Sequence, residues 1–342
     1  MENEDVSSKI ENIIKKSNKN FIEDDLIPFL RIPSISLNQE DVIKAKNFLS
    51  SYISAFCEEI KEFKGIVNPL ILAKVQGKLE DTLLIYMMYD TQPISKKDEW
   101  ISNPFDANIK DLPAPLDKLG DCIIARGSYN SKTPLLCFLN IIKILKQNDS
   151  LPISLLLLFD GEEEIGSPTL LSMLEDEKFN FRNCIDAYYP SAKQDLSGNL
   201  VLKLGYKGIL SLTVKVSSEN KEPHSAFSGM IPNPSVDLIS LLNTIYSNNE
   251  FQISSLRKPY ELSDEENSII DNLMKTLDIE NIKRKAGIVQ ILDIDPKTAL
   301  INYLFKPTFN ISTLKSGYLE NGSKNFVPNQ AICNVERPCA RS

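Results

Sequence analysis

One stretch of the sequence constrains the fold more than any other. Residues 151–167 read LPISLLLLFDGEEEIGS, so a nearly unbroken apolar run stops at Asp160, Gly161 and three consecutive glutamates. An apolar run of this length, bounded by Pro152 and Gly161, fits a strand buried on both faces, as in a parallel sheet covered by helices. In open α/β sheets, sites collect beyond the carboxyl ends of such strands, which indicates a site at the glutamates.

The same acidic turn has a second interpretation, the start of a solvated helix. Asp160 would cap that helix, and Glu162, Glu163 and Glu164 would favour the positive end of its dipole. On this stretch alone, both interpretations stay open.

The composition excludes several classes of partner. The chain has 46 acidic and 38 basic residues and a net charge of −8, which argues against nucleic acid or an anionic membrane. The N-terminus has no apolar core of signal-peptide type, and no stretch approaches the roughly 20 apolar residues that span a bilayer. We therefore expect a cytoplasmic protein, and its length of 342 residues predicts two domains.

The single histidine, His224, limits the chemistry. Any mechanism that needs two imidazoles is excluded within one chain. The six cysteines are scattered, and no CxxC or Cys/His spacing suggests a structural zinc site.

The apolar pattern predicts a first domain of strands and helices. Strands are expected at 70–75, 82–88, 122–125, 184–189 and in the opening stretch, and those at 82–88 and in the opening stretch have the apolar character of buried strands. Helices are expected at 23–31, 40–64 and 168–177, and another, capped by Asn130 or Ser131, runs to about residue 146. This last helix connects residues 122–125 to the opening strand as a right-handed parallel crossover, while residues 96–120 are expected to form a surface loop.

Two of these strands deliver carboxylates at their carboxyl ends. The strand at 82–88 is followed by Tyr89 and Asp90, and the opening strand is followed by the three glutamates. This pattern favours a shared cleft.

A change of pattern near residue 198 predicts a second domain. Residues 199–216 alternate as an antiparallel strand pair would, and 234–247 form an amphipathic helix. A charged helix at 261–277 and strands at 309–314 and 330–335 follow. We expect domains at 1–197 and 198–342.

Six motifs, in order, resemble a known family. They are YMMYDTQP (86–93) for YGHYDVQP, Trp100 with 103–105 for W-x-x-DPF, RGSYNSKT (126–133) for RGxxDxKG, GEEEIGS (161–167) for GEEExGS, His224-Ser225 with Gly229 for HSGxxGG, and KPTFNI with SGYLENGSKNFVP (306–328). The family is the co-catalytic zinc peptidases, which include carnosinase-type dipeptidases, glutamate carboxypeptidase, acetylornithine deacetylase and succinyl-diaminopimelate desuccinylase. The last motif resembles its dipeptidase branch.

The resemblance implies an α/β fold and a reaction. The fold is a mostly parallel sheet flanked by helices, with an inserted α+β lid domain that often mediates dimerisation. Two zinc ions would polarise an amide bond of a dipeptide or N-acyl amino acid and ionise a bridging water. Glu163 matches the general base, Glu164 a metal ligand, and Asp90 the acid that orients a histidine ligand from behind. His224 matches a lid histidine that reaches the partner's active site.

The departures from the family are at the metal. Met88 replaces the first histidine ligand, and Asn130 replaces the bridging aspartate. No carboxylate aligns near residues 188–190, and the last histidine belongs to a C-terminal catalytic segment that this sequence is expected to lack. Of five ligand positions only Glu164 is filled, so we expect weak zinc binding or none.

Three readings of the function remain. The first is an active hydrolase of small peptides that uses other ligands, such as Asp160, Glu162 or Cys184, or a partner that completes the site. The second is a catalytically silent homologue that forms a homodimer, or a heterodimer with an intact paralogue, through the lid. The third is a decaying, truncated gene product.

Individual residues also have plainer interpretations. His224 could be an ordinary lid-surface histidine, and Asp90 could pair with Lys132 or accept a hydrogen bond from a backbone N–H. Without a metal to offset their repulsion, Glu163 and Glu164 should include at least one carboxyl with a raised pKa.

Overall fold

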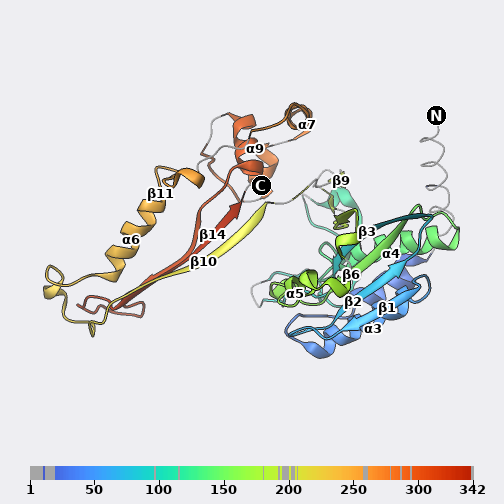
Figure 1. The fold of residues 1–342 in the computed structure, drawn as a ribbon, viewed down its shortest axis with the longest axis horizontal. Coiled ribbons are helices and arrows are strands. Elements are labelled where there is room, and N and C mark those ends of the chain that lie inside the picture. Colours follow the sequence, from blue (N-terminus) through green and yellow to red (C-terminus); the bar gives the residue numbers. More distant parts are fainter. Residues whose placement is uncertain are drawn as a thin grey trace. The chain divides into compact units, whose positions relative to one another are not determined.

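The computed structural model divides the chain into two compact units, Met1–Lys203 and Leu204–Ser342 (Figure 1). It describes residues 11, 20–95, 98–114, 116–179, 181–191, 193–194, 200–201, 205, 207–256, 261–277, 279–285, 287–292 and 295–339. Within these residues, no helix has the length and apolar character needed to cross a membrane.

A five-stranded sheet forms the centre of the first unit. Its order is β1-β2-β6-β3-β7, from Glu59–Phe63, Leu70–Val75, Ile153–Asp160, Leu79–Met88 and Asp186–Tyr188. Strand β3 pairs in parallel with β6 and β7, whereas β2 pairs antiparallel with β1 and β6. The α/β class is confirmed, and the sheet is mixed where a mostly parallel one was expected.

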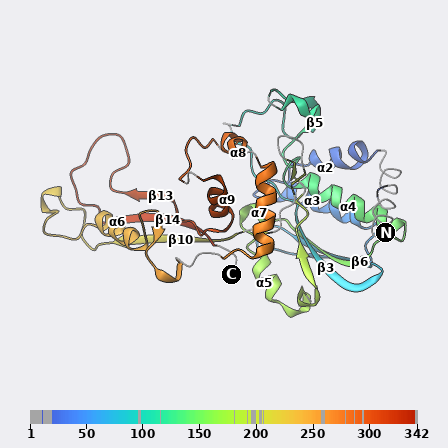
Figure 2. The same cartoon turned by 90° about the horizontal axis from the view of Figure 1, so that it is seen from above.

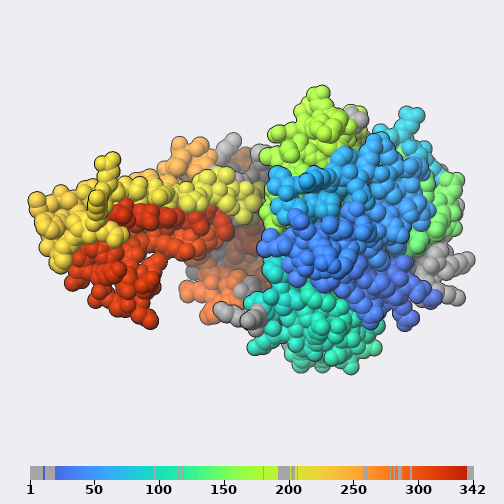
Figure 3. Space-filling model, turned by 90° about the horizontal axis from the view of Figure 1, so that it is seen from below, coloured from blue at the N-terminus to red at the C-terminus, as the bar shows by residue number. Residues whose placement is uncertain are grey.

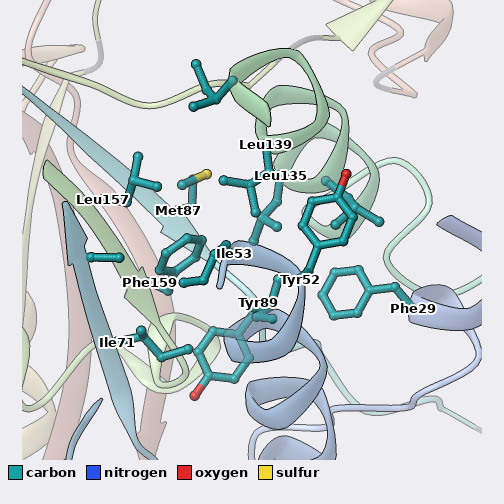
Figure 4. Close-up of a cluster of buried hydrophobic side chains, with 14 of the residues drawn as sticks. Phe29, Tyr52, Ile53, Ile71, Met87, Tyr89, Leu135, Leu139, Leu157 and Phe159 are labelled. Atoms are coloured by element: carbon teal, nitrogen blue, oxygen red, sulfur yellow. The ribbon is translucent and has the colours of Figure 1, made fainter. Parts of the chain in front are cut away.

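Helices cover one face of this sheet, and the larger hydrophobic core lies between them and the strands. These helices are α2 (Ile27–Leu30), which follows a π-helical turn η1 (Ile22–Leu26), α3 (Gln39–Ile53) and α4 (Lys132–Gln147). Alternate strand side chains, such as Met87 and Phe159, meet Ile53 and Leu139 from the helices (Figure 4). Burial of such apolar side chains is the dominant stabilising term of the unit.

The other strand side chains face a smaller core. Leu84, Leu156 and Leu158 pack there with Met173 of α5 (Leu170–Glu175). The short 3₁₀ turns η4 (Glu177–Phe179) and η5 (Phe181–Asn183) complete this layer. The helices α2, α3 and α4 therefore lie on one side of the sheet and α5 on the other (Figure 2). In the space-filling view, residues near the N-terminus, coloured blue, form much of one side of the unit (Figure 3).

Two predicted segments of the first unit are wrong in their extent. The helix expected at 40–64 ends at Ile53, and residues 59–63 form strand β1, which pairs antiparallel with β2. The loop expected at 96–120 contains strand β4 (Asn108–Asp111) and the 3₁₀ turn η2 (Asp117–Leu119). Strand β4 forms a two-stranded hairpin with β5 (Asp121–Ile124).

The predicted crossover from 122–125 is also wrong. Strand β5 pairs with β4 and lies outside the five-stranded sheet, so the parallel neighbours are β3 and β6, with α4 between them in the chain. Helix α4 begins at Lys132 after Ser131, and neither Asn130 nor Ser131 caps it with a side-chain hydrogen bond.

The second unit is built on an antiparallel sheet. Its order is β10-β14-β13, from Gly208–Ser217, Gln330–Cys339 and Asn310–Ser316. Leu238 and Leu242 of α6 (Pro234–Ile245) pack on Ala331, Cys333 and Val335 of β14. The pairing expected within 199–216 is wrong, because β10 pairs with β14 and β9 (Leu200–Val201) pairs with β8 (Lys193–Gln194).

Smaller elements complete the second unit. They are η6 (Ser225–Phe227), β11 (Tyr246–Ser247), β12 (Glu250–Phe251), η7 (Ser254–Leu256), α7 (Asp264–Thr276), α8 (Ile279–Lys285) and α9 (Pro296–Phe305). The lid and dimerisation roles expected for residues 198–342 stay predictions.

Truncation of the central strand should destabilise the first unit. Leu157 of β6 is fully buried, so Leu157→Ala should lower the free energy of unfolding by about 3 kcal/mol. The same truncation at Leu79 of β3, which is 55% exposed, should cost less than about 1 kcal/mol. Urea unfolding followed by the fluorescence of Trp100, the single tryptophan, reports the first unit. Equal losses for the two variants would contradict this assignment of the core.

Candidate functional site

Two neighbouring strands of the sheet end at the same level. In the parallel pair of β3 and β6, Met88 lies opposite Asp160. The turn after β3 (residues 89–92) and the turn after β6 (residues 161–164) therefore share one edge, and a backbone hydrogen bond from Tyr89 N to the Asp160 carbonyl oxygen joins them. This edge is the candidate site.

Asp90 is completely buried at the centre of the site. Its Oδ2 accepts hydrogen bonds from Ser36 Oγ at 2.7 Å and from Glu164 N at 3.0 Å, and its Oδ1 accepts one from Glu163 N at 3.3 Å. Burial raises the pKa of Asp90 to about 6 even though Ser36 and Glu164 donate to it. The interpretation of Asp90 as an acceptor for backbone N–H groups is confirmed.

Asp160 is the second buried carboxylate of the site. It accepts hydrogen bonds from Ser167 Oγ at 2.6 Å, Glu162 N at 2.8 Å and Tyr86 OH at 3.0 Å. Burial raises its pKa, against the effect of these donors. The residues after Asp160 form only a 3₁₀ turn, η3 (Glu163–Ile165). The alternative prediction, a helix that starts at the glutamates and is capped by Asp160, is therefore wrong.

Glu162 has a role that the sequence did not reveal. Its Oε1 accepts from the backbone N–H groups of Val67 at 2.6 Å and Asn68 at 2.9 Å, and its Oε2 accepts from Thr169 N at 3.0 Å. Burial alone would raise the pKa of Glu162, but these hydrogen bonds outweigh it and lower the pKa. Only the three-dimensional contact with residues 67–68 shows this role, and no motif signals it.

Glu163 and Glu164 differ from the three buried carboxylates. Glu164 Oε2 accepts a hydrogen bond of 2.8 Å from Gln92 Nε2. The Glu163 carboxylate has no hydrogen-bond donor among the residues that the structure describes. Burial, followed by repulsion from Glu164, Asp90 and Asp160, raises the pKa of Glu163 to about 7. The predicted raised pKa is therefore confirmed for Glu163.

Asn130 and Met88 are the positions at which the sequence predicts substituted metal ligands. Asn130 Oδ1 accepts a hydrogen bond of 3.4 Å from Tyr189 OH, and the Tyr189 ring lies 5.9 Å from that of Tyr86. Met88 is buried on β3 and offers a thioether, which is a poor zinc ligand beside imidazole.

The donors present do not fit a two-zinc centre. No group of three or more His, Cys, Asp or Glu side chains is placed to hold a metal ion in the part of the chain that the structure describes. The oxygens of Asp90, Asp160 and Glu162 already accept hydrogen bonds from the protein. Cys184 packs beside the smaller core, where burial raises the pKa of its thiol. A stable zinc site generally needs three or more protein ligands.

Lys132, inside the motif that carries Asn130, is fully buried. Its Nζ donates to the carbonyl oxygens of Phe29, at 3.1 Å, and Ile32, and it lies 4.7 Å from the centre of the Phe29 ring. Burial lowers its pKa to about 7. In the described structure Lys132 meets carbonyl oxygens, so the alternative pairing with Asp90 is wrong.

His224 belongs to the second unit and is exposed. Its Nδ1 accepts a hydrogen bond of 3.1 Å from Ala226 N at the start of η6. In the neutral imidazole this contact selects the tautomer with the proton on Nε2, whose N–H then faces away from η6 as a donor group. Its predicted catalytic role and the plain surface role both stay predictions.

Residues 84–290 match the model of peptidase family M20/M25/M40, and the chain belongs to this family. The resemblance seen in the sequence motifs is thereby confirmed.

Individual relatives are metallopeptidases. The chain is 28% identical to the Cys-Gly metallodipeptidase dug1 of Schizosaccharomyces pombe over 77% of its own length and 55% of that protein. It is 25% identical to the Beta-Ala-His dipeptidase of Rattus norvegicus, over 77% and 53%. The chain therefore spans about half the length of these curated relatives.

Solved structures show the same fold. The M20 family metallo-carboxypeptidase Sso-CP2 from Sulfolobus solfataricus is 29% identical, with a TM-score of 0.78 over 92% of this chain and 70% of that one. Human carnosine dipeptidase 1 is 19% identical, with a TM-score of 0.64 over 98% and 73%.

Two neighbouring glutamates should respond oppositely to loss of charge. Glu162→Gln keeps the shape but cannot accept all three backbone N–H groups, so it should lower the free energy of unfolding by about 2 kcal/mol. Glu163→Gln should raise the free energy of unfolding at pH 8 by roughly 1 kcal/mol, since the side chain is partly solvated and its repulsion is screened.

The effect of Glu163→Gln should depend on pH. Folding raises the pKa of Glu163 from 4.5 to about 7, so the folded chain binds this proton more tightly than the unfolded chain. The Glu163 carboxylate therefore does not destabilise the fold below about pH 4.5, and its destabilising effect is complete above about pH 7. Urea unfolding at several pH values should show that the gain in free energy of unfolding from Glu163→Gln becomes smaller as the pH falls. Equal effects of the two variants at pH 8 would contradict the assignment.

Proposed function

We propose that this chain is a member of the peptidase family whose own residues do not catalyse hydrolysis, and that it acts as a dimerisation partner through its second unit. One observation carries the first part: the polar groups at a predicted ligand position, Asn130, and behind one, Asp90, already have hydrogen-bond partners in the protein. The Asp90 carboxylate accepts hydrogen bonds from Ser36 Oγ and from two backbone N–H groups, and Asn130 Oδ1 accepts one from Tyr189 OH. Removing these partners to admit a metal would leave buried polar groups unpaired, which is costly.

The substitute ligands considered from the sequence do not weaken this proposal. Asp160 and Glu162 each accept three hydrogen bonds from the protein. Rotating either carboxylate toward a metal would break contacts to residues 67–68, 167 and 169. Both residues therefore support the fold of the site.

A second candidate function is hydrolysis of dipeptides in a site completed by further polypeptide. It is favoured by Glu163, whose pKa of about 7 suits a general base, beside the retained ligand Glu164. Two of the relatives are named for the dipeptides Cys-Gly and β-Ala-His. Because the chain spans about half of those proteins, this activity would need ligands from outside the described residues.

The second unit offers a surface suited to a second copy of the same unit. An apolar groove with a cavity volume of about 410 Å³ lies between α6 and β13. Of its lining residues, Ile239 is 58% exposed and Leu314 is 53% exposed. No charged side chain lines the groove, whose walls are formed by Ile239, Leu242, Asn243, Tyr246, Phe309, Ile311 and Leu314.

Strand β13 adds a second feature to this surface. Among the described strands it lies at one end of the order β10-β14-β13, so its outer backbone groups have no strand partner in the described sheet. A second copy related by a twofold axis would present the same helix and the same strand, which makes the surface self-complementary. Exposed apolar side chains beside an unpaired strand edge favour association.

A charge placed in the groove should separate the dimer. We expect the purified chain to be dimeric by light scattering, and Ile239→Asp to shift it toward the monomer by at least about tenfold in dissociation constant, because a carboxylate would be desolvated in an apolar contact. Val289→Asp, at a residue 93% exposed outside the groove, is the matched control and should leave the mass unchanged.

The other outcomes separate the two candidate functions. A wild-type chain that is monomeric throughout would sink the dimerisation proposal. A dimer that survives Ile239→Asp would place the interface elsewhere. Turnover of Cys-Gly or β-Ala-His by the purified chain supplied with zinc, cobalt or manganese would contradict the silent-homologue reading and support the second candidate.

A further inference from the structure

Residues 29–36 form a partly buried strap that connects two loops of the site. One loop is residues 127–133, which carries Asn130 and runs into the first turn of α4, and the other is the turn at 89–92, which carries Asp90. The strap begins with the last residues of helix α2 and contacts each loop through hydrogen bonds as well as through apolar packing.

Lys132 holds the first end of the strap. Its Nζ donates to the carbonyl oxygens of Phe29 and Ile32, which lie at the carboxyl end of α2. A cation is favoured there because the helix dipole places partial negative charge on these carbonyl groups. The ammonium also lies over the Phe29 ring, and the side chain is fully buried. Burying an ammonium group costs free energy unless its N–H groups donate hydrogen bonds, as they do here.

The loop that carries Asn130 is shaped around this lysine. Gly127 has φ +89°, a conformation that side chains rarely adopt, and a Cβ built on it would lie 3.0 Å from Lys132 Cδ. Thr133 N donates to the Gly127 carbonyl oxygen at 3.3 Å, which closes the loop. The path of residues 127–133 therefore depends on the place of the Lys132 side chain.

The turn at 89–92 holds the second end of the strap. Ser34 Oγ donates to the Tyr89 carbonyl oxygen at 2.9 Å, and Thr91 Oγ1 donates to the Pro33 carbonyl oxygen at 2.7 Å. The backbones of Ser34 and Ser36 exchange hydrogen bonds with Thr91 at 2.9 and 3.1 Å. Ser36 Oγ completes the set on the Asp90 carboxylate at 2.7 Å.

We propose that this strap is a built-in cross-link between the loops carrying Asn130 and Asp90, so that protein groups alone set the geometry of the site and no divalent metal is needed for it. In this assignment Asp90, which the family motif places behind a histidine ligand, is an anchor for Ser36. The strap then explains how the site keeps its geometry although its donors do not fit a two-zinc centre. Buried, charge-assisted hydrogen bonds are strong and rigid when every member is satisfied.

Thermal unfolding of the full chain tests the cross-link. Trp100 fluorescence is a suitable probe, because Arg126, next to the loop at 127–133, lies 5.3 Å from the Trp100 ring. The midpoint should change by less than about 2 °C between EDTA and excess zinc or manganese, since a ligand that does not bind the folded state cannot stabilise it. Ser36→Ala should lower the midpoint by about 5 °C, by the same amount in EDTA and in zinc.

A matched variant and a milder variant complete the design. Ser54→Ala removes an exposed hydroxyl at the end of α3 and should shift the midpoint by less than about 1 °C. If Ser36→Ala does not fold, Thr91→Val, which removes only the bond to the Pro33 carbonyl, should give a smaller loss that is again independent of metal.

Two results would overturn the proposal. One is a midpoint that falls by several degrees in EDTA, or that zinc raises by several degrees while rescuing Ser36→Ala. The other is a Ser36→Ala variant whose unfolding midpoint equals that of the Ser54→Ala control. The strap concerns the first unit and does not rest on dimerisation, so light scattering on the same samples separates its failure from that of the proposed function.

Discussion

The parallel pairing of β3 and β6 is the constraint on which the site depends. It brings Asp90, Asp160 and Glu162 to one edge of the sheet, and all three are buried. Buried carboxylates destabilise a fold unless each one accepts hydrogen bonds or is neutralised. In this chain, backbone N–H groups and the hydroxyls of Ser36, Ser167 and Tyr86 supply the donors. The polar edge therefore supports the fold through the protein's own groups.

Family membership does not by itself determine the chemistry of this site. The chain belongs to peptidase family M20/M25/M40, and its first unit keeps the acidic turn of the motif. Function depends on the constellation of side chains rather than on the fold. Met88 and Asn130 change that constellation, and Tyr189 has become the partner of Asn130. Glu163 is the exception, because burial, followed by repulsion from Glu164, Asp90 and Asp160, raises its pKa and no described donor offsets this effect.

Much of the fold followed from the sequence because burial leaves a periodic signal. The strand predicted at 70–75 is β2, and the apolar run before Asp160 is β6. The sequence does not reveal strand β1, because Glu59–Phe63 is short and charged and its pairing with β2 is seen only in the structure. Strand direction was also not readable, since a buried antiparallel strand such as β2 has the same apolar composition as a parallel one.

The site was predictable in its parts and less so in its contacts. The motifs locate Met88, Asn130, Glu163 and Glu164 in the sequence, and their roles at a metal site stay predictions. The roles of Glu162 and Lys132 could not, because their partners lie far away in the sequence. Glu162 binds the backbone of residues 67–68, and Lys132 binds carbonyl oxygens of residues 29 and 32. Hydrogen bonds of this kind leave no periodicity and no short motif.

The zinc content of the purified chain tests the central claim most directly. Equilibrium dialysis against zinc, followed by elemental analysis, gives the number of ions held per chain. The account predicts less than one equivalent, because the described residues do not assemble the three or more ligands that a stable zinc site needs. Two tightly held equivalents per chain would contradict it and would restore the two-metal centre that the sequence motifs imply.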